Sequence, residues 1–360
     1  MHLLITGNTG FIGPIMTRLA KAWGHSVTGL DVGYFKSCIP EGQSDVLPDR
    51  QIWRDIRDVT AADLEGADAI IHLAGLSNDP MGALNARITY DINLDSTVRL
   101  GELAKAAGVS RFVFASSCSI YGAAGDSAAP LDETAPFNPV SAYAVSKVKS
   151  EEGLSRLADG DFSPVFMRNA TAYGVSPRTR FDLVLNNLAG WAYTAGIVKV
   201  MSDGTPWRPL THIEDISRAA LCAAAAPRDT VHDQAFNIGR NDANYQVRDI
   251  AVAVQRAFPD ATLDIAGETG GDSRSYKVNF DKALERLPGF APEWTLEKGV
   301  DEIARFLTEG GLRDHTFDSR LFIRLKQLQY AMDQGSLDSN LRVLKPADAS
   351  LAARPAVRQA

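Results

Sequence analysis

A tyrosine and a lysine at helical spacing are the residues of this sequence best suited to acid–base chemistry. Tyr143 and Lys147 stand four residues apart in Tyr-Ala-Val-Ser-Lys, and on a helix this spacing puts both side chains on one face. A cation beside a phenol favours the phenolate and lowers the tyrosine pKa, which would make Tyr143 a general base near neutral pH. Ser117, at the end of a strand-like stretch, could share a substrate hydroxyl with it. These residues predict proton transfer from an alcohol.

A glycine-rich segment after the first strand-like stretch could hold a pyrophosphate. Its glycines follow the pattern Gly-x-x-Gly-x-x-Gly. Glycine lets the backbone turn tightly and approach a phosphate, and the N-terminus of the next helix offers unpaired N–H groups. At a first strand-to-helix turn, this pattern predicts a dinucleotide site. The residues expected to contact the cofactor there are Gly7, Thr9, Gly10, Phe11, Ile12 and Gly13.

Two acidic residues follow later strands and could contact the nucleoside. Asp31 ends the second strand-like stretch. A carboxylate there accepts hydrogen bonds from both ribose hydroxyls and repels a 2′-phosphate, which favours NAD over NADP. Asp55 and Ile56 follow the third stretch, residues 51–54. The Asp55 carboxylate could accept a hydrogen bond from the adenine amino group, or it could be an ordinary surface acid.

Alternating strands and helices are expected to position these residues. Strand signals cover residues 2–6, 26–30, 51–54, 69–73, 111–115 and 164–167. Helical signals follow at 84–107 and from about Ser141, then at 181–195, 213–226, 247–257, 296–309 and 320–332. This alternation predicts a parallel sheet with helices on both faces. The expected fold class is α/β, a Rossmann-type doubly wound parallel sheet with a smaller α/β substrate-binding lobe.

Three regions are expected along the chain. Residues 1–175 would form the NAD-binding domain, with residues 205–235 returning to it. Residues 176–310 would form the nucleotide-binding lobe for the substrate. Residues 311–360 would be a helical extension followed by a frayed tail, because the last stretch is rich in Ala, Pro and Arg.

Composition excludes several other classes of protein. Hydrophobic residues make up 45% and charged residues 22% of the 360 residues, which suits a globular core. The net charge of -7 argues against nucleic-acid binding, which needs a basic face. The sequence has neither a signal peptide pattern nor an apolar run of the roughly 20 residues that span a bilayer. Three widely spaced cysteines fit a reduced cytosol, and six scattered histidines predict no metal site. We therefore expect a cytoplasmic protein with no membrane partner.

Taken together, these motifs resemble those of the extended short-chain dehydrogenase/reductases, in the nucleotide-sugar epimerase/dehydratase family. The resemblance extends from residue 1 to about 310. The matching residues are the three loop glycines, Asp31, Asp55, Ile56, His72, Leu73, Ala74, Gly75, Asn93, Ser117, Tyr121, Gly122, Tyr143, Lys147, Arg168, Tyr173 and Gly174.

This resemblance implies roles for individual residues. NAD would be the cofactor, and Leu73, Ala74 and Gly75 would line its site. Tyr143 would be the acid/base and Lys147 would bind the nicotinamide ribose. Ser117 would assist at the sugar hydroxyl. Asn93 would support the helix and the water near Lys147, and it would count among the cofactor-binding residues.

A second group of residues resembles the family's nucleotide-sugar site. Arg208 and Arg274 match two arginines that reach the diphosphate, a role suited to the planar guanidinium fork. Asn187 and Leu188 match an Asn-Leu pair at the start of a helix that touches the sugar diphosphate. The full set of expected substrate contacts is Ser117, Cys118, Ser119, Thr171, Asn187, Leu188, Arg208 and Arg274.

Two positions depart from the family pattern. Ser117-Cys118-Ser119 stands where the 4,6-dehydratases have Thr-Asp-Glu, whose carboxyl groups eliminate water, so 4,6-dehydration is not expected. Thr171 stands where the family usually has Asn, which changes the pocket floor. Cys118 could act as an acid or base on a 4-keto sugar, and is then a further catalytic candidate. It could equally be a small buried strand residue.

Three functions are compatible with the sequence. The favoured one is an NAD-dependent nucleotide-sugar epimerase with a transient 4-keto sugar, in which hydride leaves C4 and returns to it. The second is a 3- or 5-epimerase, or another enzyme of decarboxylase or dehydratase type, that uses Cys118 on the 4-keto sugar. The third is a non-catalytic dinucleotide sensor, against which the intact Ser117, Tyr143 and Lys147 argue. The family resemblance also implies a homodimer through the helices at 84–107 and 142–158.

Overall fold

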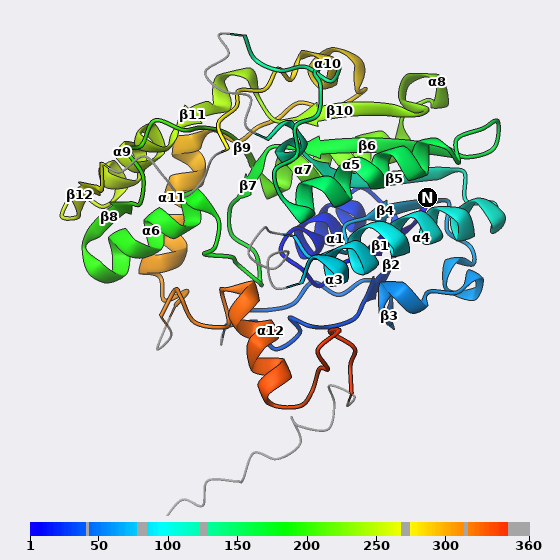
Figure 1. Ribbon diagram of the computed structural model, residues 1–360, viewed down its shortest axis with the longest axis horizontal. Coiled ribbons are helices and arrows are strands. Elements are labelled where there is room, and N and C mark those ends of the chain that lie inside the picture. Colours follow the sequence, from blue (N-terminus) through cyan, green and yellow to red (C-terminus); the bar gives the residue numbers. More distant parts are fainter. Residues whose placement is uncertain (41–42, 78–84, 123–128, 268–273, 313–315, 345–360) are drawn as a thin grey trace, which may run out of the picture.

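A parallel sheet of seven strands forms the centre of the molecule (Figure 1). The computed structural model describes residues 1–40, 43–77, 85–122, 129–267, 274–312 and 316–344. The strand order is β10-β6-β5-β4-β1-β2-β3, and all six neighbouring pairs are parallel. The strands are β1 (His2–Thr6), β2 (Ser26–Asp31), β3 (Arg50–Trp53), β4 (Ala69–His72), β5 (Arg111–Ser117), β6 (Ser163–Asn169) and β10 (Gln234–Ile238).

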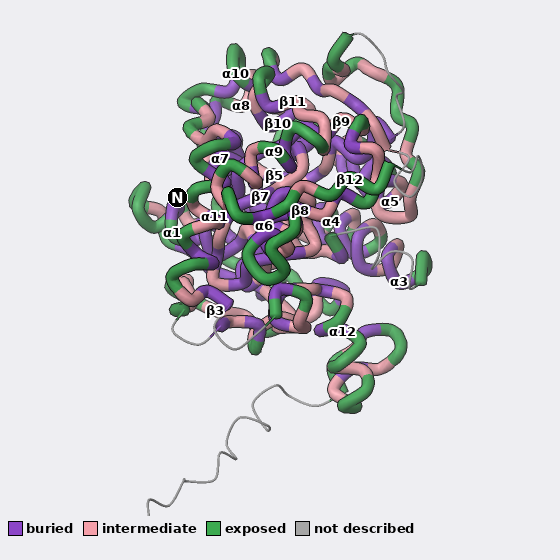
Figure 2. The backbone as a smooth tube through the Cα atoms, turned by 90° about the vertical axis from the view of Figure 1, so that its left-hand side faces the viewer, coloured by how far each residue is buried: buried purple, intermediate pink, exposed green. Residues whose placement is uncertain are grey.

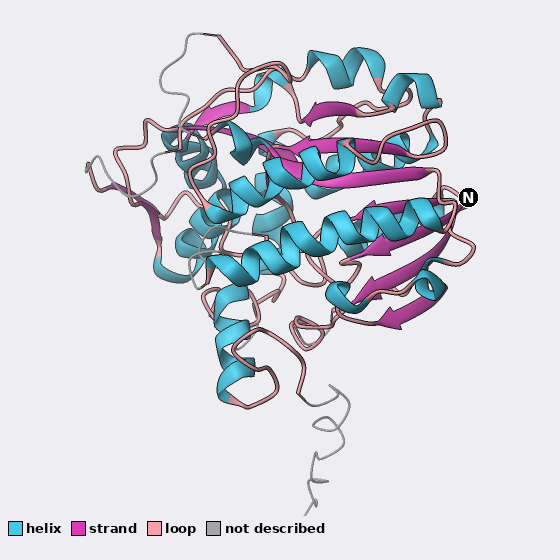
Figure 3. Ribbon diagram, turned by 45° about the vertical axis from the view of Figure 1, so that its right-hand side comes forward, coloured by secondary structure: helices cyan, strands magenta, loops and turns pink. Residues whose placement is uncertain are grey.

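Helices cover both faces of this sheet, as Figure 3 shows for one face. Alternate residues of β1 point to opposite sides: Leu3 and Ile5 enter the apolar core that contains α1 (Gly13–Ala22) and α7 (Ile213–Ala225). Leu4 enters the core on the other face, with residues of α4 (Ser96–Ala106) and α5 (Ala142–Ser155). Because both faces are buried, the strands are nearly continuous apolar runs. The predicted α/β class and doubly wound parallel sheet are confirmed.

The helix predicted at 84–107 contains a π-helical segment. It consists of α3 (Ala86–Tyr90), the π segment η3 (Asp91–Asp95) and α4, while Leu84 lies outside the described residues. The π segment places Asn93, which is 1% exposed, inside the protein. Such π segments are rare and often lie at functional sites.

A second, smaller group of elements packs beside the sheet around its own apolar core. One short sheet has the order β11-β9-β7, with β9 antiparallel to β11 and parallel to β7, and β8 pairs with β12 in another. The elements are β7 (Thr171–Tyr173), β8 (Ile197–Val200), β9 (Trp207–His212), β11 (Asn244–Gln246), β12 (Thr262–Ile265), α6 (Val184–Ala195), α9 (Val247–Ala257) and α11 (Leu296–Thr308).

Short elements complete the described chain. They are η1 (Ile56–Asp58), η2 (Ala61–Leu64), η4 (Cys118–Tyr121), η5 (Asn241–Ala243), α8 (Arg228–Val231) and α10 (Asp281–Arg286). The C-terminal extension contains α12 (Arg324–Asp333), which lies at the edge of the molecule (Figure 2). The expected frayed tail falls on residues 345–360, which lie outside the described residues.

Candidate active site

A cavity of about 730 Å³ lies at the carboxyl ends of the central strands. Strands β2 and β4 flank β1 on opposite sides, so the strand order reverses there, and ligands of open α/β sheets bind at such a point. Most of the residues predicted from sequence line it. They are Gly7, Gly10, Phe11, Ile12, Gly13, Asp31, Asp55, Ile56, Leu73, Ala74, Gly75, Ser117, Ser119, Tyr143, Lys147, Thr171, Asn187, Leu188, Arg208 and Arg274.

The glycine-rich loop has the shape that a pyrophosphate site needs. Gly7 has a φ of +72°, and a Cβ there would lie 2.8 Å from the backbone N of Ala74. A Cβ on Gly13 would lie 2.5 Å from the Cα of Asn8. Helix α1 begins at Gly13, and its N-cap residue, Ile12, makes no side-chain hydrogen bond. The helix N-terminus therefore offers backbone N–H groups at the cavity wall, so this loop fits a dinucleotide phosphate.

The Asp31 carboxylate is held in place by backbone donors. The amide of Thr9 donates to its Oδ2 at 3.1 Å, and that of Gly33 donates to its Oδ1 at 2.7 Å. Thr9 does not line the cavity itself, so its part in the site is this backbone bond. A fixed negative charge at the end of β2 suits a ribose with free hydroxyls and disfavours a 2′-phosphate.

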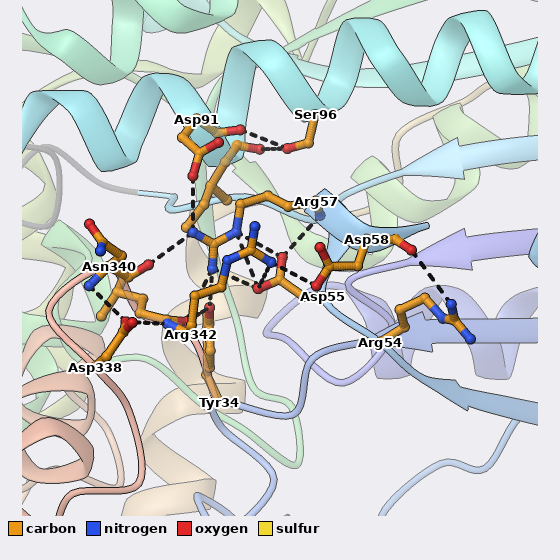
Figure 4. A network of polar contacts seen from close by, with 12 residues as sticks. Tyr34, Arg54, Asp55, Arg57, Asp58, Asp91, Ser96, Asp338, Asn340 and Arg342 are labelled. Atoms are coloured by element: carbon orange, nitrogen blue, oxygen red, sulfur yellow. Dashed lines mark hydrogen bonds and ion pairs between the residues drawn. The ribbon is translucent and has the colours of Figure 1, made fainter. Parts of the chain in front are cut away.

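Asp55 lines the cavity, but its carboxylate is already paired. Arg57 donates to it from Nη2 at 2.6 Å and from Nε at 3.0 Å, and its backbone N adds a bond at 2.9 Å. Arg342, from the C-terminal extension, lies 3.4 Å away. Figure 4 shows this network. Both carboxylate oxygens are thus engaged by arginines, and the contact to the adenine amino group stays a prediction.

Helix α5 brings Tyr143 and Lys147 to the cavity. The Oγ of its N-cap residue, Ser141, accepts from the backbone N of Ala144 at 3.2 Å. The Lys147 Nζ donates to the carbonyl of Ala115 at 2.6 Å and lies 5.7 Å from the centre of the Tyr143 ring. Burial lowers the pKa of Lys147 to about 8, although the Glu151 carboxylate favours its charged form. An ammonium group thus stands beside the tyrosine, as the spacing predicts.

Buried polar atoms at the ends of β5 and β6 face the same region. The Oγ of Ser117 accepts from the backbone N of Ser119 at 3.1 Å. The Oγ of Ser119 and the Oδ1 of Asn169 are buried without a hydrogen-bond partner among the described residues. Both residues line the cavity, so a ligand could supply the missing partner. Asn169 was not among the residues that the sequence singled out for the site.

Asn93 supports the site from behind and does not line the cavity. Its Oδ1 accepts from the backbone N of Leu76 at 2.7 Å, and its Nδ2 donates to the Leu76 carbonyl at 2.9 Å. The Nδ2 also lies 3.4 Å from the Oγ of Ser146, the neighbour of Lys147. Asn93 therefore joins the π segment to helix α5 and to the segment that follows β4.

The structure differs from the sequence expectation at Cys118. This residue is 0% exposed and packs in an apolar cluster with Ile120, Val148 and Phe280. Its Sγ donates to the carbonyl of Arg168 at 3.1 Å, and burial raises the pKa of the thiol well above its usual range. Cys118 opens the short helix η4, whose N-cap is Ser117, and it does not line the cavity, although its neighbours Ser117 and Ser119 do. Cys118 thus matches the structural alternative.

Two arginines from separate segments meet on the smaller lobe. Arg208 in β9 donates from Nη1 to the backbone carbonyl of Arg274, and both residues line the cavity. Asn187, in the first turn of α6, donates to the carbonyl of Phe181 at 2.8 Å. The residues expected to contact a sugar diphosphate therefore line the same cavity, together with Leu188 and Thr171.

Sequence reasoning missed two further arginines at the cavity. Arg180 donates to the Oγ of Ser77 at 2.9 Å and forms an ion pair with Asp182 at 2.9 Å. Arg324 comes from α12, in the extension whose role the sequence does not reveal. Both line the cavity. The segment Arg178-Thr179-Arg180-Phe181-Asp182 is a visible charge pattern, but only the fold shows where it points.

Comparison with known proteins places the chain in a family. The model of the NAD dependent epimerase/dehydratase family matches residues 3–239. The UDP-glucose 4-epimerase of Mycolicibacterium smegmatis is 28% identical over 323 residues, which are 85% of this chain and 98% of the relative. The UDP-glucuronate 4-epimerase of Thermodesulfobacterium geofontis is 27% identical over 323 residues, 86% of this chain and 96% of the relative.

A solved structure is similar over nearly the same extent. MoeE5, in complex with UDP-glucuronic acid and NAD, superposes with a TM-score of 0.74 at 26% identity, covering 87% of this chain and all of that one.

In the part of this chain that the structure describes, every helix is too short or too polar to cross a membrane. The dinucleotide loop, the Tyr143–Lys147 helix and the family match agree: the chain belongs to the NAD dependent epimerase/dehydratase family, is an NAD-dependent enzyme, and has the extended short-chain dehydrogenase/reductase fold.

Proposed function

We propose that this enzyme is a nucleotide-sugar 4-epimerase that acts through a transient 4-keto sugar. The observation that carries the proposal is the content of one cavity. The same cavity is lined by the dinucleotide loop, by Ser117, Tyr143 and Lys147, and by Arg208 with Arg274. A sugar diphosphate bound to the two arginines would place its sugar toward Tyr143.

The residues of this chain have separate tasks in such a reaction. Tyr143 takes the proton from the C4 hydroxyl and later returns it. Ser117 binds the same hydroxyl, and the Lys147 ammonium stabilises the phenolate and binds the nicotinamide ribose. Bound NAD supplies the redox chemistry at C4. Turning the 4-keto sugar between the two half-reactions exposes its other face, so the configuration at C4 is inverted.

The surroundings of Cys118 support the 4-epimerase over enzymes that alter C3, C5 or C6. A buried thiol with a raised pKa that does not line the cavity is poorly placed to move a proton on a sugar. Among the described residues, the carboxylates that line the cavity are Asp31, Asp55 and Asp182. The first is bound by two backbone amides, and the other two pair with arginines.

The assembled acid–base group argues against a non-catalytic sensor. Lys147 could serve dinucleotide binding alone, but a protein that only binds the dinucleotide has no need of Ser117 and Tyr143 beside it. We also propose that residues 1–175 with 205–235 form the NAD-binding domain and that residues 176–310 form the nucleotide-sugar lobe, with strand β9, which carries Arg208, reaching into the smaller sheet. The homodimer expected through the helices near 84–107 and 142–158 stays a prediction.

The test is a substrate panel. Purified enzyme is incubated with UDP-, GDP-, CDP- and dTDP-hexoses and hexuronates, and the products are separated by chromatography and assigned by NMR. We expect one nucleotide sugar to reach equilibrium with its C4 epimer. Since two relatives are named as UDP-sugar 4-epimerases, UDP-glucose and UDP-glucuronate are the first substrates to test. A product changed at C3, C5 or C6, or no conversion in the whole panel, would overturn the proposal.

A further inference from the structure

The C-terminal extension is attached to both halves of the cavity wall. Its residue Gln327 donates to the carbonyl of Tyr34 at 3.2 Å, just after β2. Its residue Phe322 accepts from the backbone N of Phe181 at 3.2 Å, in the segment before α6. Leu328 is fully buried in the core shared with β1 and β4. The extension is therefore a packed part of the fold between residues 322 and 328.

The far end of the extension is fixed by a buried arginine of the main domain. Arg57 donates from Nη1 to the carbonyl of Asn340 at 2.9 Å and from Nη2 to that of Leu341 at 3.2 Å (Figure 4). The Tyr34 hydroxyl also donates to the Leu341 carbonyl. Arg342 pairs with Asp58 at 2.7 Å. Both ends of the extension thus hold the segments around Tyr34 and Asp55 beside the adenosine end of the cavity.

Within the first attachment, between Phe322 and Gln327, Arg324 lines the cavity and one nitrogen of its guanidinium is unpaired among the described residues. Arg324 is 2% exposed, and its Nη2 donates to the carbonyl of Arg178 at 2.6 Å. Its guanidinium carbon lies 4.5 Å from the centre of the Phe35 ring. Its Nη1 is buried and has no hydrogen-bond partner among the described residues. Leaving a buried charged donor unpaired is costly, so a ligand is the natural partner.

The charges around Arg324 indicate an anionic ligand. Arg178 pairs with Asp45 at 2.8 Å and Arg180 pairs with Asp182 at 2.9 Å, which cancels these two positive charges. Arg324 forms no ion pair in the described chain, and the carboxylate that favours its charged form, Asp182, is already paired with Arg180. Burial, together with the charge of Arg180, lowers its pKa to about 10, so it is still protonated at neutral pH. One uncompensated positive charge therefore faces the cavity, where a phosphate could neutralise it.

The position of Arg324 identifies which phosphate this would be. Phe35, which its guanidinium stacks on, lies shortly after Asp31 in the chain. Arg180, the neighbouring cation, donates to Ser77, two residues after Gly75. Asp31 and Gly75 belong to the predicted cofactor side, whereas the predicted sugar-diphosphate site is on the wall with Arg208 and Arg274.

We propose that the C-terminal extension completes the cofactor site and that Arg324 binds a phosphate of NAD opposite the glycine-rich loop. This inference rests on the NAD site alone and not on the choice of sugar substrate. By this contact, the extension would help the enzyme to retain its cofactor. The solved MoeE5 structure leaves 13% of this chain uncovered, so part of this chain has no counterpart there.

The test measures binding, independently of turnover. Enzyme freed of NAD is titrated by calorimetry with NAD, ADP-ribose, adenosine and the active nucleotide sugar, for wild type, Arg324→Gln and Arg324→Lys. The control is Lys326→Gln, an exposed cation of the same extension that pairs with Asp318 at 3.0 Å and does not line the cavity. The melting temperature without ligand shows whether each variant folds.

We expect Arg324→Gln to weaken NAD and ADP-ribose about tenfold to a hundredfold, as for the loss of a charged hydrogen bond. Adenosine and the nucleotide sugar should change less than about twofold, and the purified variant should carry less NAD. Lys326→Gln should match the wild type. Equal losses for adenosine and ADP-ribose, a loss confined to the nucleotide sugar, or unchanged NAD affinity in folded Arg324→Gln would overturn the proposal. If Arg324→Gln does not fold, Arg324→Lys decides: it keeps the charge but loses the fork, and unchanged ADP-ribose affinity would refute the contact.

Discussion

At the scale of single residues, the buried ammonium of Lys147 connects stability with chemistry. Lys147 is 6% exposed, and its Nζ donates to a backbone carbonyl of β5. The protein interior disfavours the charged form, while the proposed reaction depends on it. In the free enzyme, the charged form of Lys147 is therefore only partly stabilised, and we expect bound cofactor and substrate to stabilise it further.

This cost predicts a specific pH dependence of stability. The pKa of Lys147 falls from 10.5 to about 8 on folding, so between these values the unfolded chain binds more protons than the folded one. Stability contributed by this site therefore rises with pH across that window. Lys147→Met lacks this titrating group. Relative to that variant, we expect the wild type to gain about 2 kcal/mol of unfolding free energy between pH 8 and pH 10. Urea unfolding of both proteins without NAD measures it, and a constant difference would contradict the buried charge.

Removing the phenol tests the proposed acid–base group. Tyr143→Phe removes only the hydroxyl, so folding and NAD content should stay as in the wild type, while kcat for the active sugar falls about 10²–10⁴-fold. Tyr193→Phe is the matched control, because Tyr193 is exposed on α6 and does not line the cavity. Turnover in Tyr143→Phe above about a tenth of the wild-type rate would mean that another group moves the proton.

At the scale of elements, the loop between β1 and α1 is built for close backbone contact. A Cβ on Gly13 would meet the Cα and O of Asn8 and the O of Gly7, each at 2.5 Å. These are backbone atoms, so the loop itself would have to shift. Gly13→Ala should therefore lower stability by about 1–3 kcal/mol and weaken NAD at least about tenfold.

Gly160→Ala is the control for this loop variant, because a Cβ there meets nothing within 4 Å. Thermal melting and NAD titration of both variants give the comparison. Equal effects of the two substitutions, or wild-type NAD affinity in Gly13→Ala, would show that the close approach of the loop is not required.

Sequence patterns predicted most elements of the main sheet because its strands are short apolar runs punctuated by glycines and polar turns. They could not predict the π segment at 91–95, which depends on long-range bonds: Asn93 is tied to Leu76 and Ser146. The orientation of the Cys118 side chain could not be predicted from the sequence either. Whether that side chain enters the cavity depends on the single turn of η4, and not on its residue type.

At the scale of the whole molecule, the site residues that the sequence predicted differ from those it missed in their sequence separation. The predicted residues lie close together in the sequence, and the missed ones lie far from the residues that they contact. The glycine-rich loop and the Tyr143–Lys147 pair are local in sequence, so their spacing reveals them. Arg324 meets Arg178 and Phe35 only because the chain after α11 returns to the main domain, where Gln327 bonds to Tyr34. No local pattern encodes that contact, and the family motifs end before it.

The two parts of the molecule have different tasks in the proposed reaction. The seven-stranded sheet presents the cofactor loop and the acid–base residues at one edge, and the smaller lobe adds Arg208 and Arg274. All chemistry in the proposal occurs at C4 of the sugar, with Tyr143 as the only proton-transfer group. No carbon-bound hydrogen other than that on C4 should therefore move.

An isotope experiment tests this central claim most directly. The active nucleotide sugar is prepared with deuterium at C4 and converted in ordinary water, and the unlabelled sugar is converted in heavy water, with wild type and Cys118→Ala. We expect that the epimer keeps its deuterium at C4, that no solvent deuterium enters C3 or C5, and that both proteins turn over. Deuterium from solvent at C3 or C5 that disappears in Cys118→Ala, or loss of the C4 label to water, would contradict it.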